Sequence, residues 1–262
     1  MVAVTGEPVL ALRGVSKRFG AVQALTDIEL EVHSGSVVAL VGDNGAGKST
    51  LVKAIAGVHQ PDEGTIEWDG RPVTIHRPQD AQHLGIATVY QDLALCDNLD
   101  VVGNLFLGRE LKRFSVLDEV GMEKRSRELL DTLSIRIPSV RIPIASLSGG
   151  QRQVVAIARA LIGRPKVVML DEPTAALGVE QTAQVLDLVE RLRDQGLGVI
   201  LISHNMADVM AVADTVAVLR LGRNNGVFAK SDTNQEEIIS AITGATDNAV
   251  TRRQARGTEG TS

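Results

Sequence analysis

Residues 37–50 read VVALVGDNGAGKST, in which a fully apolar run leads directly into a glycine-rich segment. A run that is apolar at every position is typical of a strand buried on both faces of a parallel sheet. The glycines allow the backbone to wind tightly around an anion, and a helix is expected at residues 50–57. Backbone N–H groups and the N-terminus of that helix would then point at phosphate oxygens. The order of strand, loop and helix therefore predicts a phosphate-binding loop, and a simple Asn-Gly loop that caps a helix is the less favoured alternative.

The residue types within this loop suit a nucleotide that is bound together with a metal ion. Lys48 would supply a positive charge to the outer phosphates, and Ser49 would offer its hydroxyl to Mg²⁺. The predicted nucleotide contacts in the loop are Gly42, Asp43, Asn44, Gly45, Ala46, Gly47, Lys48, Ser49 and Thr50.

A second motif lies at residues 167–172, where the apolar run VVML ends in Asp171 and Glu172. Ligands bind at the carboxyl ends of parallel strands, and two adjacent acids at that position are costly unless they have a role. Asp171 is predicted to hold Mg²⁺ through water, and Glu172 is predicted to polarise the water that attacks the γ-phosphate. The alternative is that the acids only help to cap a helix near residues 173–174, which is less favoured because a phosphate-binding loop lies upstream.

A third motif, LSGGQ at residues 147–151, precedes a helix that is expected to begin near Arg152. Ser148 is placed as the N-cap, and the two glycines leave the end of the helix bare. This arrangement is compatible with a second anion site. Taken alone, however, Ser-Gly-Gly is more often a flexible turn, so the motif does not by itself decide between the two interpretations.

With these three motifs, the chain resembles the nucleotide-binding subunit of ATP-binding cassette (ABC) transporters over residues 10–228. The resemblance implies an ATPase that uses ATP and Mg²⁺. It also implies an α/β fold in which a P-loop NTPase parallel sheet carries an antiparallel β subdomain and a helical insertion. In that family the LSGGQ motif binds the γ-phosphate of the ATP held by the opposite subunit, so two chains would form a head-to-tail homodimer on binding ATP. The residues that would make this contact are Ser148, Gly149, Gly150 and Gln151.

Three further residues have expected roles only through this resemblance. Gln91, after an expected strand at residues 87–90, is similar to the glutamine that senses Mg²⁺ and the attacking water and connects the core to the membrane partner. His204 is similar to the switch histidine that contacts the γ-phosphate and orients the water near Glu172. Phe19 is similar to the aromatic residue that stacks on adenine. Without the resemblance, they would be interpreted as a surface glutamine, a structural histidine and a core phenylalanine.

One position departs from the family pattern. After residues 171–174 the family usually has Ser-Ala-Leu-Asp, whereas this chain has Ala-Ala-Leu-Gly at residues 175–178. In the family the aspartate reaches across the dimer, so Gly178 is expected to loosen its segment and to restrain basal hydrolysis. The same four residues, together with QDLAL at residues 91–95 and SHNM at residues 203–206, resemble ATPases of bacterial sugar importers of the ribose and xylose type.

The domain organisation follows from the patterns along the chain. Alternating apolar residues before residue 33 and an Asp-Gly hairpin at residues 65–75 predict an antiparallel sheet. Leucines at helical spacing, among them Leu107 and Leu111, predict a helical insertion at about residues 92–162. Alternating helices and apolar strands elsewhere predict a parallel α/β core. The expected domains are an ABC ATPase domain at residues 8–244 and a disordered C-terminal tail at residues 245–262.

The composition limits the classes of partner. The 262 residues include 27 Lys and Arg and 32 Asp and Glu, a net charge of -5, so no broad basic field is present to attract nucleic acid. No stretch approaches the ~20 apolar residues that span a bilayer, and the cytosol is the expected compartment. The resemblance implies a peripheral protein at the cytoplasmic face of the cell membrane, which acts with separate integral membrane permease subunits and, indirectly, with a solute-binding protein.

The sequence leaves two other functions open. A soluble ABC ATPase of translation or DNA maintenance ranks lower, because such proteins usually carry fused cassettes, long coiled coils or basic arms, and this chain carries one cassette. A P-loop kinase is disfavoured because residues 147–151 would then have no role. Many sugar-import ATPases carry two cassettes in tandem. Because this chain carries one, two copies of it would have to pair.

Overall fold

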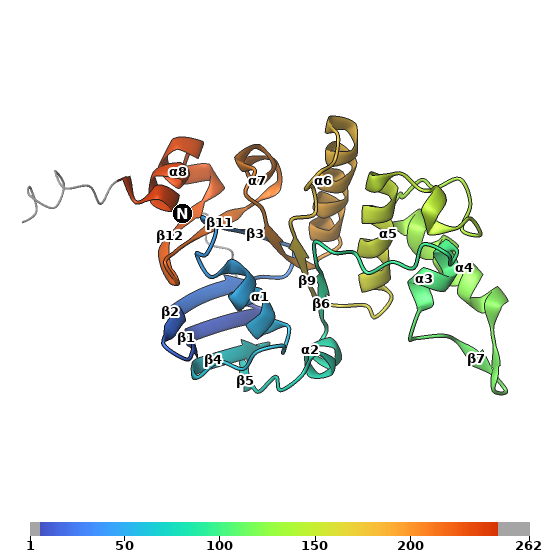
Figure 1. Cartoon of the computed structure of the whole chain (residues 1–262), viewed down its shortest axis with the longest axis horizontal. Coiled ribbons are helices and arrows are strands. Elements are labelled where there is room, and N and C mark those ends of the chain that lie inside the picture. The colour runs from blue at the N-terminus through green and yellow to red at the C-terminus, as the bar shows by residue number, and fades with distance from the viewer. Residues whose placement is uncertain (1–5, 246–262) are drawn as a thin grey trace, which may run out of the picture.

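The computed structural model describes residues 6–245. A six-stranded sheet lies at the centre, a four-stranded antiparallel sheet lies beside it, and a mainly helical region forms one end of the molecule (Figure 1). This arrangement confirms the predicted α/β class with an antiparallel subdomain. No helix among residues 6–245 has the length and apolar character needed to cross a membrane.

The central sheet carries the predicted apolar strands. In spatial order it contains β12 (Arg223–Ala229), β11 (Thr215–Arg220), β3 (Val37–Val41), β10 (Gly198–Ile202), β9 (Val167–Asp171) and β6 (Ile86–Val89). All of these strands run parallel except β12, which pairs antiparallel with β11. β3 and β10 are buried along their whole length, as their sequences predict. The segments that follow β3, β9 and β10 therefore leave the sheet at the same edge.

Helices cover the central sheet on the side opposite the antiparallel sheet. They are α5 (Gly149–Leu161), α6 (Val179–Asp194), α7 (Met206–Val212) and α8 (Gln235–Thr243), whereas α1 (Lys48–Ile55) lies on the other side. Val199 and Leu201 of β10 share a core with α5 and α6, and Ile200 and Ile202 share a second core with α1 and the antiparallel sheet. The alternation of side chains along a strand explains why one apolar strand serves two cores.

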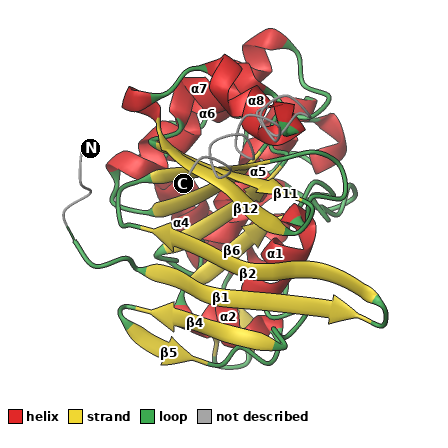
Figure 2. Ribbon diagram, turned by 90° about the vertical axis from the view of Figure 1, so that its left-hand side faces the viewer, coloured by secondary structure: helices red, strands yellow, loops and turns green. Residues whose placement is uncertain are grey.

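The antiparallel sheet has the spatial order β2 (Val22–Val32), β1 (Leu10–Phe19), β4 (Glu63–Trp68) and β5 (Arg71–Val73). Figure 2 shows these strands at the side of the molecule away from α6, α7 and α8. Asp69 and Gly70 connect β4 to β5 with positive φ angles of 48° and 71°, which confirms the predicted Asp-Gly turn. The short helix α2 (Pro78–Leu84) then leads to β6.

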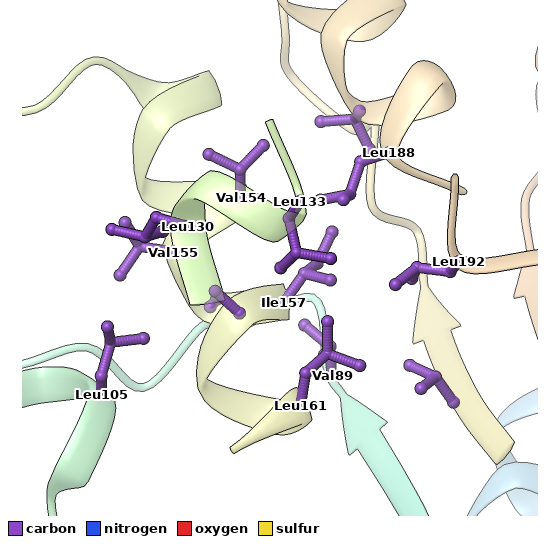
Figure 3. Packing of buried hydrophobic residues seen from close by; sticks show 14 of the residues in the cluster. Val89, Leu105, Leu130, Leu133, Val154, Val155, Ile157, Leu161, Leu188 and Leu192 are labelled. Atoms are coloured by element: carbon purple, nitrogen blue, oxygen red, sulfur yellow. The ribbon is translucent and has the colours of Figure 1, made fainter. Parts of the chain in front are cut away.

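The region between β6 and β9 is helical, but a β-hairpin interrupts it. Its elements are α3 (Val101–Phe106), the hairpin of β7 (Lys112–Arg113) and β8 (Val116–Leu117), α4 (Glu119–Thr132), the 3₁₀ turn η1 (Ile144–Ser146) and α5. The helical interpretation of Leu107 and Leu111 is therefore wrong. α3 ends at Phe106, and Phe114 and Ser115 form the hairpin turn with positive φ angles. Figure 3 shows α5 at the centre of the core of this region, with Val155 and Ile157 among its buried side chains.

Helix boundaries differ from prediction by one to three residues where a cap sets them. α1 begins at Lys48, and α5 begins at Gly149, directly after its N-cap Ser148. The described chain ends with the 3₁₀ turn η2 (Lys230–Asp232) and α8. The tail predicted at residues 245–262 lies outside the described residues apart from Ala245.

Candidate active site

The glycine-rich loop connects β3 to α1 and borders a cavity of about 620 Å³. Residues 43–50, Gln91, Asp171 and Glu172 all line this cavity. The structure therefore brings together predicted site residues that are separated by more than 120 positions in the sequence. Residues 22–24 of β2 also line the cavity, and no motif in the sequence marked them.

Two glycines are required for the course of this loop. Gly42 has a φ of 149°, and a Cβ atom at this position would overlap the carbonyl oxygen of Leu219. Gly47 has a φ of 105°, and its Cβ atom would lie 2.9 Å from Leu25 Cδ2. Both conformations are accessible to glycine and strained for other residues. The loop thus packs against the strands on both of its sides, which fixes the direction of its backbone N–H groups.

Lys48 is held by the loop that precedes it. Its Nζ donates hydrogen bonds to the carbonyl oxygens of Gly42 and, at 3.0 Å, of Asp43. Burial lowers the pKa of Lys48, and the carboxylates of Glu172, Asp43 and Asp171 act in the opposite direction. The ammonium group is therefore positioned over the loop and close to the acidic strand end, where phosphate oxygens would offer it further acceptors.

The two predicted carboxylates stand at the end of β9. Burial is the main factor that raises the pKa of Asp171; the neighbouring Glu172 raises it further, and Lys48 lowers it. The backbone N–H of Glu172 donates to the carbonyl oxygen of Ile202 at 3.0 Å, and Glu172 has a positive φ of 51°. This turn directs the chain away from the sheet immediately after Asp171 and places the two side chains at the cavity.

His204 contacts Glu172 directly. Its Nδ1 lies 2.7 Å from Glu172 Oε2, and the side chain of His204 is 73% exposed whereas that of Glu172 is 16% exposed. His204 follows β10, and β10 pairs with β9. The adjacency of the two strands explains why residues 32 positions apart in the sequence lie in contact at one edge of the sheet.

The LSGGQ motif lies elsewhere in the chain. Ser148 Oγ accepts a hydrogen bond from the backbone N–H of Gln151 at 3.2 Å, and Gln151 Oε1 accepts one from the N–H of Ser148 at 3.0 Å. These two bonds form a capping box at the start of α5. Ser148 and Gln151 line a separate cavity of about 330 Å³ beside α6. The structure therefore does not bring this motif to the phosphate-binding loop of its own chain.

The glycines of the motif differ in the space around them. A Cβ atom on Gly150 would lie 2.9 Å from both Cβ and Cγ of Gln181 on α6, whereas a Cβ atom on Gly149 would lie 3.4 Å from Leu177 Cδ2. Gly150 therefore permits the close approach of α5 to α6, a packing role that the sequence alone did not indicate.

The surroundings of Phe19 and Gly178 differ from those that their predicted roles imply. Phe19, at the end of β1, packs edge-on against His59 with the ring centroids 5.1 Å apart, and it does not line the loop cavity. Lys17 Nζ lies 5.5 Å from the Phe19 ring. Gly178 is the N-cap of α6 with a φ of −73°, and no heavy atom lies within 4 Å of an added Cβ. Because any residue adopts this conformation, Gly178 does not use the backbone freedom that was expected to loosen its segment.

Comparison with known proteins gives matches along most of the chain. A family model described as ABC transporter matches residues 25–175. The xylose/arabinose import ATP-binding protein of Sulfolobus acidocaldarius is 47% identical over 90% of this chain and 94% of its own length. The fructose import ATP-binding protein of Rhizobium meliloti is 44% identical over 91% of this chain and 95% of its own length. A ribose import ATP-binding protein of Rubrobacter xylanophilus is 43% identical over 90% of this chain, which spans 47% of that longer protein.

Solved structures with the same fold are also ATP-binding cassettes. The ADP conformation of a cassette from an ABC transporter superposes with a TM-score of 0.79, at 26% identity, over 91% of this chain and 96% of that chain. A dimeric cassette in a post-hydrolysis state with ADP and Pi has a TM-score of 0.70 at 24% identity, over 84% of this chain and 98% of that chain, and shows the fold alone.

Proposed function

The chain belongs to the ABC transporter family, and we propose that it is the ATP-binding and ATP-hydrolysing subunit of an importer for a sugar. The relatives named for import of xylose or arabinose and of fructose match it almost end to end, which supports the sugar assignment. The observation that carries the enzymatic part is the convergence of Lys48, Asp171 and Glu172 on one cavity, with His204 in contact with Glu172. The alternative role in translation or DNA maintenance is not favoured by these relatives.

Nucleotide binding is assigned to the loop and α1. The N–H groups of residues 43–50 and the N-terminus of α1 would bind phosphate oxygens, and Lys48 would neutralise charge on the β- and γ-phosphates. Phe19 is proposed to contact the base. Its exposed ring lies at the end of β1, and Phe19 pairs with Val22, the first of the β2 residues that line the cavity.

The same cavity offers oxygen donors that suit Mg²⁺. The hydroxyl of Ser49, the carboxylate of Asp171 and the side-chain oxygen of Gln91 all border it, and hard divalent cations prefer such ligands. When bound, Mg²⁺ would supply positive charge beside the phosphate oxygens. No cluster of three or more His, Cys, Asp or Glu side chains suited to a metal occurs among residues 6–245, so nucleotide phosphates and water would complete the coordination.

Glu172 is the proposed general base. A carboxylate that borders the cavity can accept a proton from the water that attacks the γ-phosphate. The contact with His204 holds Oε2 of Glu172 in a defined direction and leaves Oε1 for the water. In this arrangement His204 orients Glu172, and its exposed ring is free to contact the γ-phosphate.

Two copies of the chain are proposed to complete each site. Ser148 and Gln151 border a different cavity from the loop, so within one chain they are remote from the bound phosphates. A second copy placed head to tail would present its LSGGQ motif to the nucleotide, and ATP would then stabilise the homodimer.

The membrane partner is proposed to dock beside Gln91. A cavity of about 330 Å³ lies between β6, α3 and α5, and Tyr90, Asp92 and Arg159 line it. Burial lowers the pKa of the Arg159 guanidinium, which donates to the carbonyl oxygens of Leu93 and Ala94. A cytoplasmic segment of a permease would contact this groove, and the chain would then lie at the cytoplasmic face of the membrane. A solute-binding protein would act through the permease.

The test of this function is ATP turnover by the purified chain. Glu172→Gln should abolish turnover while ATP binding is retained, because an amide cannot accept the proton of the attacking water. Gln79→Glu, on the exposed surface of α2, is a matched control that should leave turnover unchanged. Full turnover by Glu172→Gln would contradict the catalytic assignment. Co-purification of the wild-type chain with ribosomes and not with membranes would favour the alternative function.

A further inference from the structure

The loops that carry Glu172 and His204 leave the sheet side by side. Asp171 and Ile202 are the last residues that pair between β9 and β10, and the backbone N–H of Glu172 donates to the Ile202 carbonyl oxygen at 3.0 Å. Beyond this point, within the described part of the chain, no backbone hydrogen bond joins the two loops. The separation of the two proposed catalytic groups must therefore be maintained by side chains.

Asp208 provides such a connection. It lies on α7, one turn after His204, and it is only 5% exposed. Its Oδ2 accepts a hydrogen bond from Thr174 Oγ1 at 2.6 Å, and its Oδ1 accepts one from Asn205 Nδ2 at 3.0 Å. Thr174 is two residues after Glu172, and Asn205 directly follows His204. One buried carboxylate thus bonds to both loops.

The orientation of Asn205 is fixed independently. Its Oδ1 accepts a hydrogen bond from the backbone N–H of Ala207 at 3.0 Å, and its own N–H donates to Ser203 Oγ at 3.0 Å. The amide nitrogen Nδ2 is therefore directed at Asp208 and is not free to rotate. Through Asn205, the position of Asp208 is transmitted to the residue adjacent to His204.

The buried carboxylate has a cost that its hydrogen bonds only partly offset. Asp208 forms no ion pair with any residue in the described range, and its two partners are neutral donors. Burial of a carboxylate without a cationic partner is unfavourable, and the position of Asp208 in the first turn of α7, together with its two hydrogen bonds, compensates for part of that cost. We infer that Asp208 is a positioning residue, which holds the Glu172 loop and the His204 loop at a fixed separation for ATP hydrolysis. This inference rests on the proposed ATPase function.

Substitutions at Thr174 test the connection with little change in shape. Thr174→Val removes the hydroxyl and should lower kcat by about tenfold or more, because small misplacements of catalytic groups reduce rates strongly. Thr174→Ser keeps the hydroxyl and should retain kcat within about twofold. The dissociation constant for ATP should stay within about twofold of the wild-type value in both variants, because residue 174 does not line the nucleotide cavity. Thr132→Val, which removes a hydroxyl bonded to the Glu128 carbonyl oxygen on α4, is the matched control.

A double-mutant cycle separates positioning from general destabilisation. Asp208→Ala should lower kcat about tenfold or more in the wild-type background and have little further effect in a His204→Ala background, because residues that act as a unit are not additive. A merely structural loss would reduce kcat by the same factor in both backgrounds and would overturn the inference. If Asp208→Ala does not fold, equal rates for Thr174→Val and Thr174→Ser would also overturn it. The Glu172→Gln variant is measured in parallel. If this variant still hydrolyses ATP, the proposed function is contradicted. If it does not, but all Asp208 and Thr174 variants have normal rates, only the positioning role of Asp208 is contradicted.

Discussion

The two glycines of the LSGGQ motif should respond differently to the same substitution. In Gly150→Ala the new Cβ would lie 2.9 Å from Cβ and Cγ of Gln181, atoms too close to the α6 backbone to move freely. Overpacking of this kind costs about 1–3 kcal/mol. In Gly149→Ala the nearest atom, Leu177 Cδ2, is 3.4 Å away, which is an ordinary contact. Both substitutions replace Gly by Ala in the first turn of α5, so their effects on helix propensity are similar and the difference between them isolates the clash.

The assay is thermal unfolding of the two variants, nucleotide-free, followed by circular dichroism. A difference of about 2 kcal/mol corresponds to a Tm that is roughly 4–8 °C lower for Gly150→Ala than for Gly149→Ala in a chain of this size. Equal Tm values for the two variants would show that the close approach of α5 to α6 does not depend on the missing Cβ at residue 150. A lower Tm for Gly149→Ala than for Gly150→Ala would contradict the predicted clash directly.

Three further predictions concern charge and assembly. Asp171→Asn should raise the Tm of the nucleotide-free chain at neutral pH while it abolishes Mg²⁺-dependent turnover. Burial raises the pKa of Asp171, so just above the usual aspartate pKa the folded chain binds more protons than the unfolded chain. The free energy of unfolding of the wild-type chain should therefore fall as the pH rises through that range. An identical pH dependence of stability in Asp171→Asn would exclude this cause. Gly178→Asp fits without a clash and should raise ATP turnover and tighten ATP-dependent dimerisation; unchanged values of both would show that glycine is not what restrains hydrolysis. In a Glu172→Gln background, MgATP should shift the mass measured by light scattering from that of a monomer to that of a dimer. Adding Ser148→Arg should prevent this shift, because the bulky cationic side chain would occupy the place of the γ-phosphate. A Glu172→Gln chain that stays monomeric with MgATP at high protein concentration would contradict the proposed dimer.

Local sequence patterns predicted the fold where the local signal is strong. The uninterrupted apolar run of β3 and the Asp69–Gly70 turn each carry their own structural preference, and the structure agrees with both. The β7–β8 hairpin carries no such preference. Phe114 and Ser115 take positive φ angles without a Gly or Asn to indicate a turn, so the leucines nearby suggested a continuous helix instead.

The candidate site was predictable where its residues form motifs at strand ends. Lys48, Asp171 and Glu172 each follow an apolar strand, and parallel strands bring their ends together. Residues 22–24 reach the cavity only through the packing of β2 beside the loop, and Asp208 joins the two loops only through tertiary contacts. Neither relation follows from the spacing of residues along the sequence, because both depend on how distant segments pack together.

The most direct test of the proposed function is uptake of labelled sugar by cells that lack this chain. The wild-type chain should restore ATP-dependent uptake of at least one of xylose, ribose and fructose. Glu172→Gln, which should bind ATP without hydrolysing it, should restore none. Uptake that is equal in cells with the wild-type chain, with the Glu172→Gln variant and with no chain would contradict the assignment as the ATPase subunit of a sugar importer.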